Sequence, residues 1–473
     1  MLADSSVELL PTPSSPQRQS LHATTEMCAD DSNSERMKTL EHKTAQLESA
    51  PASDSTTLQE FPEGGLAAWA TAFGAFLVQF STYGYSISFG VYQDFYAQKY
   101  ITAETASTIS WIGSTNAFLF EICGLLAGRI LTRAFNSYYL LYAASFLQAF
   151  SLFMLSLAQP GSYYQVFLAQ GIGSGCAAGL LYIPSMAVVS HYFDKRREQV
   201  MTFVASGAYL GAVVHPIMLN NMINGPLGFA NGVRASAGLV SGSLLVACCL
   251  MRTRLPPSTS HANFVVATRK CARDSAFIFG CAGLAIFVVA FYYPLFYLQL
   301  DAMTLGLDKR FSFYSLVIMN ACSFVGQLSS GVLVGYLGVP IVVLIATFCG
   351  AVLLFGMTGL RTAGSVVAFG VLYGYFAGIF QALWAPVMAL LTPDLAELGV
   401  RMGIACAAMA FGGLVVMKFG HPGPPISGAL LTDKYIWWRA ALFNGLMGIV
   451  GFVMFLTMYM ILRRRERNEK TQG

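Results

Sequence analysis

The sequence has little charge. Only 11% of its 473 residues are Asp, Glu, Lys or Arg, against about 25% in a typical soluble domain. None of these four types occurs between Ala134 and Phe193. Such a run would aggregate in water, whereas a bilayer holds it as spanning helices. The net charge of +4 is too small to indicate a nucleic-acid partner.

Motifs for chemistry are also missing. There is no G-x-x-x-x-G-K-[ST] sequence to hold nucleotide phosphates, which excludes an ATP-driven pump built on that loop. The six histidines are scattered, without the clustered His, Asp or Glu of a membrane-embedded enzyme. The ten cysteines lack the paired spacing of a zinc site or a disulfide framework. We therefore expect no enzymatic activity, no cofactor and no metal.

What the sequence does have is apolar length. It is 55% hydrophobic, with a mean hydropathy of +0.57, and about 20 such residues make a helix that crosses a bilayer. The fold class expected is an all-α membrane protein with about twelve transmembrane helices. The expected spans are 66–90, 106–128, 138–157, 163–190, 199–221, 233–251, 275–298, 313–336, 339–359, 364–391, 402–430 and 437–462.

The most informative stretch runs from Gly171 to Pro216. Two apolar segments flank a compact charged turn that contains Arg196 and Arg197. Basic residues in short loops favour the cytoplasmic side, so we expect a helical hairpin with its turn in the cytoplasm. Glycines let helix backbones approach closely, and a proline frees one carbonyl. The residues expected to serve gating and helix packing are Gly171, Gly173, Gly175, Pro184, Arg196, Arg197, Gly207 and Gly211.

Three motifs carry a resemblance to a known family. The stretch Gly171–Pro216 reads G-x-G-x-G, Y-x-P, Y-F-x-K-R-R, G-x-x-x-G and a final Pro, Pro62–Trp69 reads PEGGLAAW, and Gly423–Leu430 reads GPPISGAL. In this order they resemble the fungal monocarboxylate-transporter-like branch of the major facilitator superfamily, over about 62–462. The resemblance implies two pseudo-symmetric six-helix bundles with a solute site between them, worked by alternating access.

The two halves also share a weak repeat in sequence. Gly175, Gly179 and Pro184 in the fourth span match Gly374, Gly378 and Pro386 in the tenth. The longest internal connection separates six spans from six. We therefore expect a disordered cytoplasmic tail (1–60), a first bundle (61–251), a cytoplasmic central loop (252–274), a second bundle (275–462) and a basic cytoplasmic tail (463–473).

Loop charge sets the expected orientation. An even number of spans places both termini on the same side of the membrane. The loops on that side contain most of the basic residues, so both termini are expected in the cytoplasm. The basic tail is expected to contact anionic membrane lipid. The family default is a monomer in the plasma membrane, with a vacuolar membrane as the alternative.

Glu121 is the clearest ionisable residue inside a span. It lies in the middle of the run GSTNAFLFEICGLLAG, with no basic residue nearby in sequence. Intramembrane carboxyls are costly and usually face a cavity or a partner. Glu121 is therefore a candidate for proton coupling, and a protonated carboxyl that only bonds a neighbouring helix is the alternative.

Other polar groups in the spans are candidates for the substrate pathway. Lys418 can pair with an anionic solute or with Glu121, or extend its ammonium to the outer interface. Amides and histidine can bind a solute or join helices, and aromatic rings with polar tips suit a flat solute. The expected pathway residues are Tyr83, Tyr85, Glu121, Gln170, His215, Asn320, Gln327, Tyr373 and Lys418.

The sequence departs from the carriers that transport monocarboxylates. Those carriers resemble one another in a lysine of the first helix and an arginine of the eighth. Here Phe80–Tyr92 contains no lysine, and the whole run Phe311–Leu360 is uncharged, so the eighth span has no arginine to bind a carboxylate. We expect a secondary transporter of a small organic solute that is coupled to protons. Export of a secondary metabolite is slightly favoured. Uptake of a monocarboxylate or vitamin is the alternative, and a non-transporting solute sensor is an alternative of another class.

Overall fold

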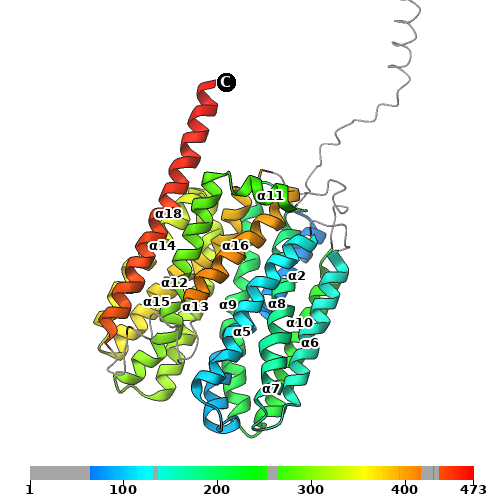
Figure 1. Cartoon of the computed structure of the whole chain (residues 1–473), viewed down its shortest axis with the longest axis vertical. Coiled ribbons are helices and arrows are strands. Elements are labelled where there is room, and N and C mark those ends of the chain that lie inside the picture. Colours follow the sequence, from blue (N-terminus) through cyan, green and yellow to red (C-terminus); the bar gives the residue numbers. More distant parts are fainter. Residues whose placement is uncertain are drawn as a thin grey trace, which may run out of the picture. The chain divides into compact units, whose positions relative to one another are not determined.

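The computed structural model describes residues 64–131, 137–252, 264–393, 395–416, 430 and 436–472. All of them belong to the second of two compact units, Phe61–Gly473. Every regular element in these ranges is a helix (Figure 1). This confirms the expected all-α fold class. The expected tail 1–60 and the motifs Pro62–Glu63 and Gly423–Ala429 lie outside the described residues.

Helices of the first half follow the chain from residue 66 to residue 250. They are α2 (Leu66–Ser81), α3 (Tyr83–Ile87), α4 (Phe89–Phe95), η1 (Tyr96–Tyr100), α5 (Ala106–Leu131), α6 (Ser137–Ser156), α7 (Tyr163–Val166), η2 (Phe167–Gly173), α8 (Ser174–Val189), α9 (Arg197–Ile223) and α10 (Gly228–Leu250).

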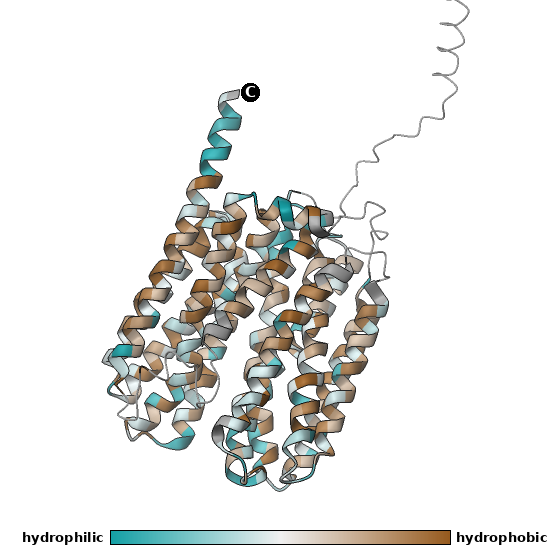
Figure 2. Cartoon of the chain, in the orientation of Figure 1, coloured by the Kyte–Doolittle hydropathy of each residue, from teal (hydrophilic) through white to brown (hydrophobic). Residues whose placement is uncertain are grey.

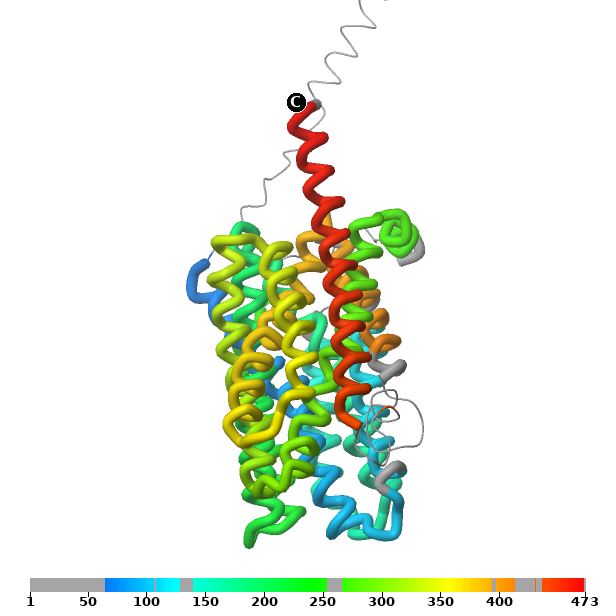
Figure 3. The backbone as a smooth tube through the Cα atoms, turned by 90° about the vertical axis from the view of Figure 1, so that its left-hand side faces the viewer, coloured from blue at the N-terminus to red at the C-terminus, as the bar shows by residue number. Residues whose placement is uncertain are grey.

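The central connection contains the short helix α11 (Phe264–Cys271). The helices of the second half that follow it are α12 (Ser275–Thr304), α13 (Lys309–Leu337), α14 (Val339–Gly356), η3 (Met357–Gly359), α15 (Ala363–Leu390), α16 (Leu395–Val416) and α18 (Trp437–Gln472). The expected central loop thus contains α11. The expected basic tail continues α18, whose hydrophilic end extends beyond its neighbours (Figures 2 and 3).

Ten helices in the described part of the chain are long and apolar enough to cross a bilayer. The other two expected spans are α16, whose continuation from 417 lies outside the described residues, and the segment α2 to η1. That segment is broken at Thr82 and runs on to Tyr100, ten residues past the expected end. Thr82 has non-helical backbone angles, and its hydroxyl donates to the Val78 carbonyl at 2.7 Å. A chain with this many apolar helices is an integral, multi-pass membrane protein.

The two halves repeat one packing pattern. In the first half, α5 packs on α8, α2 on α9 and α10, and α6 on α8 and α10. In the second half, the helices in corresponding positions pack in the same way: α13 on α15, α12 on α16 and α18, and α14 on α15 and α18. Figure 1 shows the two groups side by side. The weak repeat in the sequence is therefore a repeat in three dimensions.

The matched glycines occupy equivalent contacts. Cβ atoms on Gly175 and Gly179 of α8 would collide with the carbonyl oxygens of Asn116 and Phe120 on α5. In the second half, Gly374 and Gly378 of α15 stand in the same way against the carbonyl oxygens of Met319 and Ser323 on α13. Only glycine lets these backbones approach so closely.

Two helix pairs make the largest contacts between the halves: α9 packs on α13, and α5 packs on α16. Smaller contacts join α9 with α15 and α8 with α16. Gly331 of α13 lies against Thr202 near the start of α9, and Gly403 of α16 lies against Leu125 near the end of α5. These contacts lie near the end of α5, the start of α9 and the end of α13. The loops beside α5 and α9 are basic, whereas the connection after α13 carries no charge.

A charged cluster ties together the start of the second half. Arg401 lies within α16 with 4% of its surface exposed. Its guanidinium lies 3.5 Å from Glu397 and 3.6 Å from Asp274, the residue that caps α12. Glu397 also pairs with Lys270 of α11 at 2.6 Å. The cluster fixes α11 on α16, because a buried charge is stable only when it is paired.

Candidate functional site

Aromatic side chains from both halves meet at one place, which we call the aromatic junction: Tyr83, Phe120 and Tyr182 of the first half with Tyr292 and Trp384 of the second. The Tyr83 and Tyr292 hydroxyls lie 3.5 Å apart. The rings of Tyr182 and Trp384 stack with centroids 5.6 Å apart, and Trp384 Nε1 donates to the Tyr182 hydroxyl at 3.2 Å. Phe120 and Tyr292 lie near the middle of α5 and α12.

Sequence and packing place each ring of the junction. Tyr83 opens α3 directly after the break at Thr82. Tyr182 precedes Pro184, and the amide of Gln79 on α2 donates to the Tyr182 carbonyl at 3.3 Å and to the Ser185 hydroxyl at 2.8 Å. The same pattern recurs opposite, where Trp384 precedes Pro386. Proline weakens local backbone bonding, and in α8 the Gln79 amide holds the turn before Pro184 in place.

Glu121 lies beside the junction, next to Phe120 in the chain. Its carboxyl is hydrogen-bonded with the thiol of Cys406 on α16, so it bridges the two halves. Its Oε2 atom is buried without a hydrogen-bond partner. No Lys or Arg among the described residues lies within ion-pair distance of it. Lys418, which the sequence offered as a partner for Glu121, lies outside the described residues.

Two more expected pathway residues lie on α13. Asn320 donates to the Ala212 carbonyl of α9 at 3.4 Å, which is a further bond between the halves. Gln327 is fully buried, and neither its amide nitrogen nor its oxygen has a partner. A buried amide without partners is unusual and marks a place where polar groups rearrange or water enters.

Three expected residues lie inside the first half, away from the junction. The Tyr85 hydroxyl lies 2.8 Å from that of Tyr92. Gln170 accepts from the Tyr96 hydroxyl at 2.7 Å. The His215 ring packs against Phe80 and Tyr85, with centroids at 4.7 and 5.6 Å. These contacts join helices of one bundle.

Tyr373 has the same kind of role in the second half. It is buried, and its hydroxyl donates to the Phe291 carbonyl of α12 at 3.0 Å. Phe120, Tyr292 and Cys406 also lie at or beside the junction, and the sequence did not single them out. Tyr292 looks like one more ring in an apolar run, and Cys406 like a small core residue. Only the pairing of α12 and α16 with the first half reveals them.

The residues expected to serve gating and packing lie in the hairpin from η2 to α9. Gly171, Gly173 and Gly175 face backbone or side-chain atoms of Ile112, Ser151 and Asn116. Gly207 and Gly211 face the carbonyls of Phe76 and Phe80 on α2, and Pro184 is buried within α8. In the turn, Arg196 is exposed and Arg197 pairs with Asp194 at 2.5 Å.

Asp301 is a further buried carboxyl. It lies in the last turn of α12 with 3% of its surface exposed. Its Oδ2 atom has no hydrogen-bond partner. The described residues contain no group of three or more His, Cys, Asp or Glu that could hold a metal ion.

A junction of two repeated helix bundles, with a carboxyl and aromatic rings where they meet, defines a transporter of the alternating-access kind. The model of the Major Facilitator Superfamily matches residues 71–417, and the chain belongs to that family. It is therefore a membrane transporter.

Relatives agree with this assignment, and a solved structure agrees with the fold. The chain is 33% identical over 410 residues to the aspyridones efflux protein apdF of Emericella nidulans. The aligned region covers 85% of this chain and 80% of that protein. It is 32% identical to the agnestins efflux protein AgnL12 of Paecilomyces divaricatus, over 81% of this chain and 85% of that one. The outward-conformation structure of the transporter FucP covers 83% of this chain and 98% of its own, with a TM-score of 0.65 at 16% identity.

Proposed function

We propose that this transporter exports a small aromatic secondary metabolite, driven by protons. The observation that carries the proposal is the aromatic junction with Glu121 beside it, at the contact between the halves. The names of the relatives, which are efflux proteins for aspyridones and agnestins, support export. The fungal sources of both relatives fit a secondary metabolite.

The junction suits a flat solute with few charges. Rings of Tyr83, Tyr182, Tyr292 and Trp384 offer apolar faces, and their hydroxyl and indole groups offer hydrogen bonds at the edges. No Lys or Arg among the described residues contacts these rings, so a carboxylate would find no bidentate partner. This favours an aromatic metabolite over a small monocarboxylate.

Glu121 is proposed to couple transport to protons. A carboxyl that bonds Cys406 across the halves must lose that bond when the halves separate, and the free carboxyl then meets a different environment. It can thus take up a proton on one side and release it on the other. Breaking and re-forming the hydrogen bond to Cys406 is the step that links proton binding to the rocking of the bundles.

The remaining assignments follow from sequence and family. We propose that the chain belongs to the monocarboxylate-transporter-like branch, that it works as a monomer in the plasma membrane with both termini in the cytoplasm, and that it moves its solute without changing it covalently. The distribution of basic residues supports the orientation. The branch rests on the motifs in Gly171–Pro216, Pro62–Trp69 and Gly423–Leu430.

The first test is metabolite profiling of cells and medium, with and without the intact gene. A compound that stays in deletion cells and is absent from their medium is expected, and it names the solute. In proteoliposomes with that solute, Glu121→Gln should abolish the dependence of transport on the proton gradient while solute exchange continues. Glu104→Gln, which changes an exposed carboxyl just before α5, is the control.

Other outcomes would contradict the proposal. A nutrient left unconsumed by deletion cells would mean uptake. An unchanged metabolite profile together with no transport in liposomes would favour a sensor. Normal proton dependence in Glu121→Gln would leave export standing and move the coupling to another carboxyl, for which buried Asp301 is the next candidate.

A further inference from the structure

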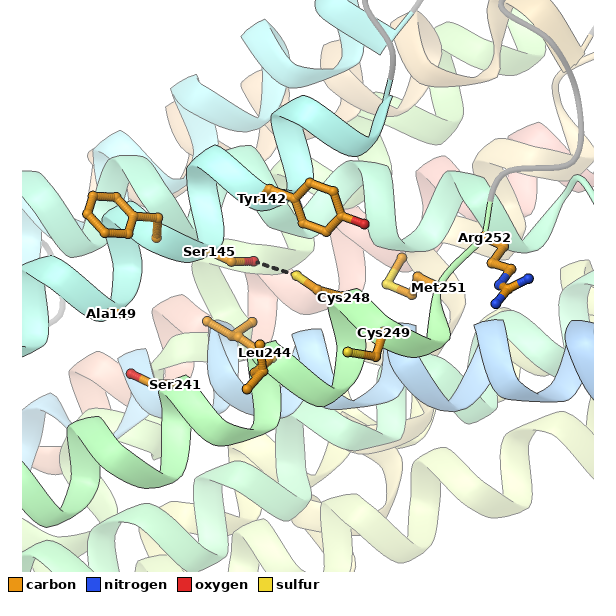
Figure 4. A pocket seen from close by; sticks show the side chains of 11 residues that line it. Tyr142, Ser145, Ala149, Ser241, Leu244, Cys248, Cys249, Met251 and Arg252 are labelled. Carbon is orange, nitrogen blue, oxygen red and sulfur yellow. Dashed lines mark hydrogen bonds between the residues drawn. The ribbon is translucent and has the colours of Figure 1, made fainter.

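A groove of about 680 Å³ lies between α6 and α10, apart from the aromatic junction. Figure 4 shows its walls: Tyr142, Ser145 and Ala149 come from α6, and Ser241, Leu244 and Cys248 from α10. The Cys248 thiol donates to the Ser145 hydroxyl at 3.6 Å and closes the floor there. Ser241 Oγ is buried and has no hydrogen-bond partner.

The groove opens toward lipid. α6 and α10 pack mainly on helices of their own half, and their outer faces carry large exposed apolar side chains. Phe146 is 72% exposed and Leu245 is 67% exposed, and both line the groove. On a helix that crosses the membrane, such side chains face acyl chains. The occupant therefore comes from the bilayer and is at least partly apolar.

A cation stands at one end of the groove. Arg252 follows the last turn of α10, and its side chain is exposed (Figure 4). Its backbone is fixed twice, because its N–H donates to the Thr71 hydroxyl at 3.3 Å and its carbonyl accepts from the Tyr192 hydroxyl at 2.9 Å. No carboxylate among the described residues lies within ion-pair distance of its guanidinium.

The dimensions match one lipid leaflet. From Ser241 to Arg252 the chain advances by about 16 Å, at roughly 1.5 Å per residue. That is about half of the roughly 30 Å hydrocarbon core. Arg252 lies at the end of α10 that adjoins the charged turn after α8, the side we assign to the cytoplasm. A headgroup at Arg252 would thus let an acyl chain fill the groove down to Ser241.

We propose that this groove binds a single anionic phospholipid of the cytoplasmic leaflet, with its phosphate on Arg252 and one acyl chain between α6 and α10. The exposed guanidinium without a carboxylate partner selects an anionic headgroup, and the apolar walls select the chain. The site does not depend on the identity or the direction of the exported solute. It depends on the orientation proposed above.

Native mass spectrometry of the full-length, delipidated protein tests the proposal. The protein is titrated with phosphatidylserine and with phosphatidylcholine of the same acyl chains. Wild type should bind one phosphatidylserine in preference to phosphatidylcholine. Arg252→Gln should weaken that binding about fivefold and remove the preference. Ala149→Phe, which fills the groove from α6, should weaken the binding of both lipids.

Arg234→Gln is the matched control. Arg234 is exposed at the opposite end of α10, where it donates to Asn231 at 3.1 Å, and its loss should leave lipid binding unchanged. Equal binding of the two lipids by wild type, or unchanged selectivity in Arg252→Gln, would overturn the proposal. So would a dimer that Ala149→Phe dissociates, because a second copy of the chain would then occupy the groove. Thermal melting shows whether Ala149→Phe misfolds or only loses the site. Because Arg252 is exposed, Arg252→Gln should fold normally, so its effect on lipid binding tests the site directly.

Discussion

At the scale of single residues, Trp384 makes the sharpest contact across the junction. It is 1% exposed, stacks on Tyr182 and donates its indole N–H to the Tyr182 hydroxyl. Trp384→Phe keeps an aromatic face and removes the donor. We expect the KM for the exported solute to rise about fivefold, because the Tyr182 hydroxyl loses the donor that orients it at the proposed site and one hydrogen bond contributes about 1 kcal/mol. Initial rates of export from inverted vesicles measure this change.

Trp438→Phe is the control for that substitution. Trp438 lies at the start of α18 with 56% of its surface exposed, so its loss should leave KM unchanged. If Trp384→Phe transported with the KM and maximal rate of wild type, the junction would be a packing contact only.

The same residues show how far sequence reasoning reaches. Glu121 could be singled out, because a lone carboxyl within an apolar run is costly wherever the run folds. Its partner Cys406 could not, since a cysteine in an apolar helix has the same pattern whether it fills the core or meets a carboxyl. Tyr85, Gln170, His215 and Tyr373 have polar tips, and the sequence does not say that those tips point into their own bundles.

At the scale of helices, glycine contacts set how closely neighbours pack. A Cβ on Gly207 of α9 would collide with the carbonyl of Phe76 on α2, whereas a Cβ on Gly238 of α10 would meet nothing within 4 Å. We expect Gly207→Ala to destabilise the protein by about 1–3 kcal/mol through overpacking. Gly238→Ala should be neutral or stabilise by up to about 1 kcal/mol, because alanine favours the helix.

Thermal melting of the two alanine variants in detergent compares them directly. Equal melting temperatures would show that α2 and α9 can separate without cost.

The sequence predicted a close helix contact at Gly207 and Gly211 from their four-residue spacing, but it did not predict which carbonyls lie opposite. It also placed most helices correctly, because apolar length alone marks a span. It missed the break at Thr82 and the polar extension of α18, which depend on local hydrogen bonds and on charge beyond the bilayer.

At the scale of the whole transporter, the repeated packing of the halves predicts how they move. Each half keeps its own set of helix contacts, and α5–α16 and α9–α13 are the contacts that must open and close. Internal repeats could be foreseen from the matched glycines and prolines, since equal spacing implies equal packing. The helix pairs between the halves could not be foreseen, because residue spacing within one half says nothing about which helix of the other half it contacts.

A pair of cysteines tests this movement. A Cβ on Gly331 of α13 would lie 2.6 Å from Thr202 Oγ1 of α9, so Thr202→Cys with Gly331→Cys brings two thiols within disulfide distance after a small shift. Oxidation should form the bond and abolish transport, because the halves can no longer separate at that end. Reduction should restore transport. Peptide mass spectrometry identifies the bond, and solute flux in proteoliposomes measures its effect.

The matched control joins two helices of one half. Gly448 of α18 faces Ala351 of α14, with a Cβ on Gly448 2.9 Å from the Ala351 Cβ, so Ala351→Cys with Gly448→Cys also suits a bond after the helices part slightly. That bond should leave transport intact, because α14 and α18 move together. If the α9–α13 bond formed and flux continued, rocking of the halves would be wrong for this protein. If both bonds stopped flux, each half would have to change internally during transport, and the helix contacts repeated in the two bundles would be part of the moving machinery.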